Sequence, residues 1–368
     1  MSPSAAAVLE DGDLLGEILL RLPPYPSSLP RASAVCTRWR SLASDPGSSR
    51  RFRRHHRRNP PLLGCFMRGG NELRFEPTLD PPNRLPQGRF PFPIDARDRS
   101  FTLLGCRHGF LLMLRKSEEI LELLVWDPVN GHEHPLAIPP GFCEKGPIHG
   151  AVLGAAHVDI DHFQVVLVTT DLEQQVIACV YSSETGVWDN FISTTLPPNV
   201  SRYGWIDQSK PAVLVGNSLY MLLHENASTI IEFDVDRKSL AVIPLPVSLD
   251  SESGRSYSVM RAEGGGLGLF FVSMSGGSAQ LWKRKTDCDG IALWVLGRTI
   301  ELDKLISPDL NSQCFLQITG LAEENNVVFL WSFLGDFMLQ LDPLQFKQLP
   351  AINLRHWHPF ESVYAAGI

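Results

Sequence analysis

The sequence of 368 residues lacks features that mark several classes of protein. It contains no apolar run of about eighteen residues, which disfavours a membrane-spanning helix. The amino-terminal MSPSAAAVLE has neither the basic start nor the apolar stretch of a secretion signal. The seven cysteines are scattered and form no Cys-x-x-Cys pair, so neither a zinc site nor a disulfide framework is indicated. We therefore expect reduced thiols, no membrane association and a location in the cytoplasm, the nucleus or both.

Catalytic and cofactor motifs are also scarce. No Gly-x-Ser-x-Gly elbow occurs, and the glycine-rich run 264–268 is followed by neither Lys-Ser nor Lys-Thr, so a tight turn explains it better than a phosphate loop. His132 and His134, and likewise His356 and His358, could face one side of a strand, but no third ligand lies near either pair in the sequence. We expect no metal, no cofactor and no catalytic residue.

Charge is distributed unevenly along the chain. The net charge is −7, yet residues 31–58 hold nine arginines and a single acid, Asp45. The remainder has 24 basic and 39 acidic residues, which argues against a protein built to wrap nucleic acid. The basic run 50–58 could still lie along phosphates or act as a nuclear import signal. We interpret it as the solvated face of a helix and keep nucleic-acid binding as an alternative.

The first sixty residues have the pattern of short helices. Leu14, Leu15, Ile18, Leu19 and Leu22 follow helical spacing, after an Asp cap at 11 or 13 and before a Pro-Pro stop. Further helices are expected from Ser27 or Ser28, from Thr37, and over residues 48–56. A module of this size is marginally stable alone. Its apolar side chains therefore imply a helical partner surface, or docking of the helices on the rest of the chain.

Three segments make the helical region specific: LEDGDLLGEILLRLPP (9–24), AVCTRW (34–39) and SLASDP (41–46). On these segments residues 9–56 resemble an F-box, with one departure, since Glu10 follows Leu9 where the family has proline. The resemblance implies binding to the SKP-family adaptor of cullin–RING ubiquitin ligases. The residues that it assigns to this contact, some of them shared with the helical core, are Leu9, Leu14, Leu15, Ile18, Leu19, Leu22, Pro23, Leu29, Val35, Cys36 and Trp39.

Beyond residue 100 the chain repeats a unit of four short strands. The second strands are expected to start at residues 110, 163, 219, 267 and 327. The third strands are expected to end near residues 127, 182, 234, 283 and 342, and the first strands to lie near 102–104, 151–153, 212–214, 257–259 and 315–317. Four strands in about fifty residues are typical of a β-propeller blade, and such blades must stack to bury their faces.

Five such units lie between residues 101 and 352. We predict a sixth blade that combines residues 62–75 with a terminal strand at 360–365 and so closes the ring, with seven blades as the alternative. LLVWDPVNG (123–131) and GLGLFFVSMSG (266–276) resemble the F-box-associated, kelch-like propellers of plants.

Aromatic and basic residues between strands suggest where a propeller would bind a partner. Tyr203, Trp205, Arg355 and Trp357 are of types that dominate protein interfaces, although packing between blades would also explain the two tryptophans.

The expected fold is therefore an α+β multidomain chain, with a small all-α F-box followed by an all-β propeller. We place a flexible tail at 1–8, the helical domain at 9–57 and the propeller at 58–368. The expected function is that of a non-catalytic substrate receptor in an SCF-type ubiquitin ligase, which binds the adaptor through the F-box and a protein of unknown identity through the propeller. The alternatives are a scaffold whose propeller binds a small molecule or glycan, and a nucleic-acid binder that acts through its basic helix.

Overall fold

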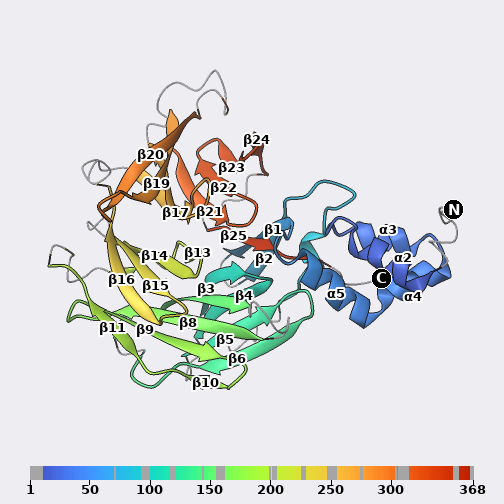
Figure 1. Ribbon diagram of the computed structural model, residues 1–368, viewed down its shortest axis with the longest axis horizontal. Coiled ribbons are helices and arrows are strands. Elements are labelled where there is room, and N and C mark those ends of the chain that lie inside the picture. The colour runs from blue at the N-terminus through green and yellow to red at the C-terminus, as the bar shows by residue number, and fades with distance from the viewer. Residues whose placement is uncertain are drawn as a thin grey trace.

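The computed structural model of the chain combines a small cluster of helices with a ring of β-sheets (Figure 1). The structure describes residues 11–364 apart from residues 70–71, 93–99, 117–120, 143–144, 155–161, 199, 201–204, 225–228, 247–254, 274–276, 303–304, 306–314 and 351–355. The helices lie at one side of the ring (Figure 1).

Four α-helices make up the amino-terminal region: α2 (Gly12–Leu20), α3 (Ser28–Ser33), α4 (Thr37–Ser44) and α5 (Pro46–His56). The Asp11 carboxylate caps α2 by accepting the backbone N–H groups of Asp13 and Leu14. Asp45 ends α4 and also caps α5, with Pro46 at the first helical position. The last helix therefore begins two residues earlier than the pattern predicts, because Asp-Pro here starts a helix as well as ending one.

Six antiparallel sheets form the blades of the propeller. The first blade contains β3 (Ser100–Arg107), β4 (Phe110–Lys116), β5 (Leu121–Asp127) and β6 (His132–Ala137), and the second contains β7 (His149–Gly154), β8 (Phe163–Thr170), β9 (Gln175–Ser182), β10 (Val187–Trp188) and β11 (Ile192–Thr195). The third blade contains β12 (Trp205–Ile206), β13 (Val213–Val215), β14 (Ser218–His224), β15 (Thr229–Asp234) and β16 (Ser239–Pro244). The fourth contains β17 (Arg255–Arg261), β18 (Leu267–Ser273), β19 (Ser278–Thr286) and β20 (Ala292–Glu301), and the fifth contains β21 (Gln317–Ala322), β22 (Val327–Ser332), β23 (Gly335–Leu341) and β24 (Leu344–Gln348). The predicted repeat of four-stranded units is thus confirmed.

The carboxy-terminal strand β25 (His358–Glu361) closes the ring. It pairs with β1 (Leu62–Gly69), which pairs in turn with β2 (Glu72–Pro77), so the sixth blade joins the two ends of the propeller. The innermost strand β25 contacts β21 on one side and β3 on the other. A 3₁₀ turn, η1 (Gln87–Arg89), follows β2 and packs against it. The predicted six blades and their closure by the last strand are confirmed.

Three strands differ from the expected boundaries. The closing strand β25 covers His358–Glu361, whereas residues 360–365 were predicted. The third strand of the fourth blade runs to Thr286 rather than Lys283 and forms a long hairpin with β20. The first strand of the fifth blade starts at Gln317, just after the apolar pair at 315–316, and continues through Gly320 at a β-bulge. In a sequence, a glycine usually indicates a turn. Here Gly320 allows the strand to pass close to Trp357, because a Cβ on Gly320 would lie 2.5 Å from the Trp357 carbonyl oxygen.

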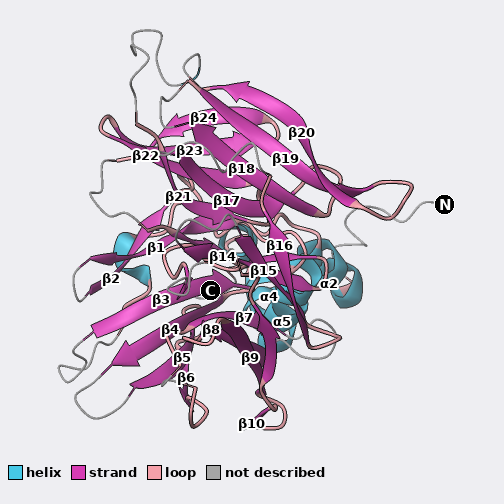
Figure 2. Ribbon diagram, turned by 90° about the vertical axis from the view of Figure 1, so that its left-hand side faces the viewer, coloured by secondary structure: helices cyan, strands magenta, loops and turns pink. Residues whose placement is uncertain are grey.

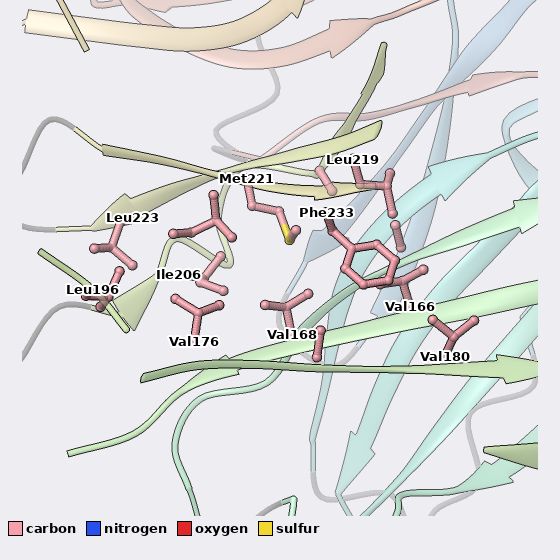
Figure 3. Close-up of a cluster of buried hydrophobic side chains, with 14 of the residues drawn as sticks. Val166, Val168, Val176, Val180, Leu196, Ile206, Leu219, Met221, Leu223 and Phe233 are labelled. Atoms are coloured by element: carbon pink, nitrogen blue, oxygen red, sulfur yellow. The ribbon is translucent and has the colours of Figure 1, made fainter. Parts of the chain in front are cut away.

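A separate apolar cluster fills each interface between neighbouring blades. Between the second and third blades, for example, Val166, Val168, Leu219, Met221 and Phe233 interdigitate (Figure 3). Equivalent clusters join the other five pairs of blades. Neighbouring blades cover the faces of each blade. This explains why strands of the propeller have nearly continuous apolar sequences.

Candidate functional site

Helix α2 divides the predicted adaptor residues into two faces. Leu15 and Leu19 are buried with Ala32 in the small core of the helical cluster. Leu14 and Ile18, one residue earlier in each turn, leave 47% and 36% of their surface exposed. The two pairs have the same spacing, but the Leu15 face supports the fold and the Leu14 face is open to a partner.

The other predicted adaptor residues are distributed in the same way. Val35 is 63% exposed after α3, and Pro23 and Cys36 are also exposed. Leu22 and Trp39 are partly buried against the helical core. Two more complete the set: Leu29 is buried, and Leu9 lies outside the described residues.

Leu29 belongs to a contact that joins the helices to the propeller. It packs with Phe52 of α5 and with Val363, which follows the ring-closing strand β25. The Ser27 hydroxyl donates to the Asn83 side-chain oxygen at 2.6 Å, and Arg53 Nη1 donates to the Asn130 side-chain oxygen at 2.9 Å. These apolar and polar contacts dock the helical cluster on the propeller. Sequence periodicity could not separate these docking residues from partner-binding ones.

The basic helix α5 is only partly a solvated face. Phe52 is buried, and Arg51 pairs with Glu17 of α2 at 2.9 Å. Arg50 and Arg54 are exposed. The arginines of this helix therefore serve both the packing of the cluster and its outer surface.

Among the residues predicted to bind a substrate, the structure describes Trp357 and the backbone of Trp205. Trp357 is 1% exposed and stacks on Phe329 with 5.2 Å between ring centroids, so it fills the interface between the fifth and sixth blades. This corrects the expectation of an exposed aromatic, because Trp357 directly precedes β25 and follows that strand into the centre of the ring. The backbone of Trp205 pairs with that of His224 in the third blade. Tyr203 and Arg355 lie outside the described residues.

A cleft lies where α5 meets the propeller, and no sequence pattern pointed to it. It is formed by the end of α5 and the following segment, by the β3–β4 and β5–β6 turns, by the segment after β21 and by the segment after β25. Its empty volume, counted out to its open mouth, is about 820 Å³. Segments this far apart in sequence meet only in the folded ring, so the site carries no local sequence signal.

An ion pair at the wall of this cleft links three blades. Arg107 pairs with Glu323 and also donates to the Ala212 carbonyl oxygen at 2.5 Å. The second carboxylate oxygen of Glu323 accepts the backbone N–H of Leu214 at 3.0 Å. Because both side chains are largely buried and fully engaged, the pair fixes the geometry of the propeller at this point.

The histidine pairs do not form a metal site in the described part of the chain. His358 is buried, whereas His356 and His132 are exposed. Among the residues that the structure describes, no group of three histidine, cysteine, aspartate or glutamate side chains is placed to hold a metal ion. Within the same residues, no helix is both long and apolar enough to cross a membrane.

Comparison with known families assigns both parts of the chain. Residues 13–55 match the F-box-like family, and residues 102–353 match the family described as F-box protein AT5G49610-like, beta-propeller. The chain belongs to this F-box propeller family. An Arabidopsis thaliana protein described as an F-box protein, At3g16210, is 25% identical over 241 residues, which cover 64% of this chain and 60% of that relative. The alignment thus leaves a substantial part of both F-box proteins unmatched.

Solved structures that overlap this F-box protein are more distant. An α-L-arabinanase of Penicillium chrysogenum complexed with arabinobiose is 12% identical, with a TM-score of 0.40 over 73% of this chain and 84% of the other. AofleA from Arthrobotrys oligospora is 14% identical, with a TM-score of 0.35 over 72% and 71%. At this level of similarity, nothing about a ligand or an activity follows from either overlap.

Proposed function

We propose that this F-box protein is a substrate receptor of an SCF-type cullin–RING ubiquitin ligase. Its helical cluster binds an SKP-family adaptor, and its propeller binds a target protein. The chain supplies no chemistry of its own. Its contribution is to hold the target near the ubiquitin-charged enzyme, which raises the effective concentration of target lysines.

The open face of the helical cluster is the observation that carries this proposal. Leu14, Ile18 and Val35 are large aliphatic side chains that remain exposed although the cluster has a core of its own. Burying each such side chain in a complex would contribute about 1.5–3 kcal/mol at full burial. Adaptor binding gives these side chains a role that folding of the chain alone does not.

Firm docking of the helices supports the second half of the proposal. A receptor that held its target on a loose tether would lose much of the gain from proximity. The contacts of Ser27, Arg53 and Leu29 with the propeller fix the helices against the blades. A target bound to the propeller would therefore be held in a defined position relative to the adaptor.

Changing the exposed aliphatic residues tests adaptor binding without disturbing the core. We expect Ile18→Asp together with Val35→Asp to weaken the affinity for a purified SKP-family adaptor by about 100-fold or more, because two apolar contacts are replaced by buried charges. The affinity can be measured by calorimetry with the full chain. Unfolding temperature should remain close to that of the wild type, since both side chains are exposed.

A matched control comes from the propeller. Leu172, in the β8–β9 turn, is 78% exposed, and Leu172→Asp should leave adaptor affinity unchanged. Leu19→Asp is a poor choice for this test, because Leu19 lies in the helical core and its loss would unfold the cluster. Equal adaptor affinity of the wild type and the Ile18–Val35 variant would refute the proposed contact.

A further inference from the structure

The cleft between α5 and the propeller has an uncompensated positive charge in its wall. Arg53 lines the cleft, and its Nη1 donates to the neutral side-chain amide of Asn130. Its Nε is buried and has no hydrogen-bond partner among the described residues. Within the same residues, no carboxylate lies within ion-pair distance of Arg53. A guanidinium without a carboxylate partner can pair with an anion that enters the cleft.

Four carboxylates line the cleft, and each has partners of its own; Glu361, for example, accepts the side-chain amide of Asn325 at 2.8 Å. Glu323 pairs with Arg107, and Glu324 pairs with Arg261 at 3.4 Å. Asp127 caps its own turn by accepting the backbone N–H groups of residues 129 and 130. The charge of Arg53 therefore remains available to a ligand that enters the cleft.

The other residues of the cleft suit a ligand that has an apolar body and a hydrogen-bonding group. Phe110, Val129 and Val363 supply apolar surface. His108 Nδ1 accepts the backbone N–H of Gly154 at 3.1 Å, so the neutral ring carries its proton on Nε2. Burial lowers the pKa of His108 to about 3, which keeps the ring neutral near pH 7. His108 can thus donate a hydrogen bond without adding charge.

We propose that this cleft binds a small organic acid with an apolar, ring-sized body. Its carboxylate pairs with Arg53, its apolar body lies against Phe110 and Val129, and a polar substituent can accept from His108. The ligand contacts both α5 and the propeller, so it binds best when the two are docked and stabilises that arrangement. This site is distinct from the exposed face of α2, and it does not depend on adaptor binding.

An anionic fluorescent probe with an uncharged analogue tests the assignment. The full chain is titrated with 8-anilinonaphthalene-1-sulfonate, which has an apolar body and one anionic group, and with the neutral N-phenyl-1-naphthylamine. We expect Arg53→Gln to weaken binding of the sulfonate by about tenfold, as expected for loss of a charge-assisted contact, and to leave the neutral probe unaffected. Equal sulfonate affinity in the wild type and Arg53→Gln would overturn the proposal.

Two control variants separate the anion contact from simpler explanations. Arg54→Gln removes the neighbouring exposed charge of the same helix and should change sulfonate affinity by less than about twofold. Asn130→Ala removes the partner of Arg53 on the propeller and should also preserve binding of the sulfonate. If Asn130→Ala weakens sulfonate binding as much as Arg53→Gln does, undocking of α5 is responsible for the weaker binding. A loss with Arg54→Gln as large as with Arg53→Gln would show nonspecific surface attraction and would also overturn the assignment.

Competition tests whether the cleft selects an acid over a neutral compound with the same ring. 1-Naphthoate should displace the sulfonate probe from the wild type, and 1-naphthalenemethanol, which has the same ring without the charge, should do so at least about tenfold less well. Equal displacement by the two compounds would exclude an acid-selective site. Unfolding temperatures of all variants, measured in parallel, confirm that each is folded during the titration.

Discussion

Glu361 is a carboxylic acid held inside the closing blade, where its proton affects stability. Its Oε1 accepts the backbone N–H of Glu324 at 3.0 Å and the side-chain amide of Asn325 at 2.8 Å. Burial raises the pKa of Glu361 to about 7, although these hydrogen bonds oppose the rise. The folded chain therefore holds this proton at pH values where the unfolded chain has released it.

The direction of the pH effect follows from that difference. An ordinary glutamate has a pKa near 4.5, so the stabilising contribution of protonated Glu361 is complete below about pH 4.5 and is lost as the pH rises to about 7. Glu361→Gln keeps the acceptor oxygen and removes the ionisation. We expect the variant to be more stable than the wild type by about 1–3 kcal/mol at pH 8, and equally stable near pH 4.5.

Thermal unfolding of both proteins across this pH range checks the prediction. His108 and His358, whose pKa values burial lowers to about 3, destabilise the fold on acidification below about pH 6.5, but they do so in both proteins. Their contribution therefore cancels in the difference between variant and wild type. A difference that does not change with pH would show that folding does not raise the pKa of Glu361.

Single residues also show what sequence reasoning can and cannot resolve. The helical spacing of α2 predicts an amphipathic element, but Leu14 with Ile18 and Leu15 with Leu19 have the same spacing and the same chemistry. Only the positions of α3 and α4 decide which pair is buried. Trp357 shows the same limit in the propeller, because an aromatic next to a strand fits a loop surface and a blade interface equally well.

At the scale of secondary-structure elements, β25 holds the propeller together. It supplies the inner strand of the sixth blade and contacts the inner strands of both neighbours. Trp357, Phe360 and Val363, in and beside it, are all buried. Loss of one such aromatic side chain typically costs about 3–5 kcal/mol, so the last strand carries much of the stability of the ring.

Truncation after residue 355 tests this dependence. Without β25, the strands β1 and β21 lose an inner neighbour, and we expect their backbone amides to exchange rapidly with solvent. Hydrogen-exchange mass spectrometry measures the loss. A synthetic peptide of residues 356–364 should restore protection, and the same peptide with Phe360→Asp should not. Unchanged protection of β1 in the truncated chain would contradict the closure role.

Element boundaries were predictable where local chemistry marks them. The second strands of the five complete blades start within one residue of the predicted positions, because turn residues precede apolar runs. The hairpin of β19 and β20 was not foreseen, since its outer strand exposes Leu293, Val295 and Leu296 and lacks the alternation of a half-buried strand. The cleft beside α5 could not be predicted at all, because contacts between distant segments form it.

At the scale of the whole molecule, the ring and the helices form one connected body. The helices contact the propeller through residues near both of its ends: Asn83, which follows β2, Asn130 in the first blade, and Val363 after β25. The helices lie at one side of the ring in Figure 1, and Figure 2, turned by 90°, shows them behind the strands. The helices therefore cover only one side of the propeller.

The most direct test of receptor function measures ubiquitin on proteins captured by the propeller. Cells express either the wild type or the Ile18→Asp, Val35→Asp variant, each fused to a proximity-labelling enzyme, and labelled proteins are scored for ubiquitin-modified lysines. The receptor account predicts that both proteins label the same set and that at least one member carries much less ubiquitin, and becomes more abundant, with the variant. Equal ubiquitin on every captured protein in the two cell populations would contradict the account.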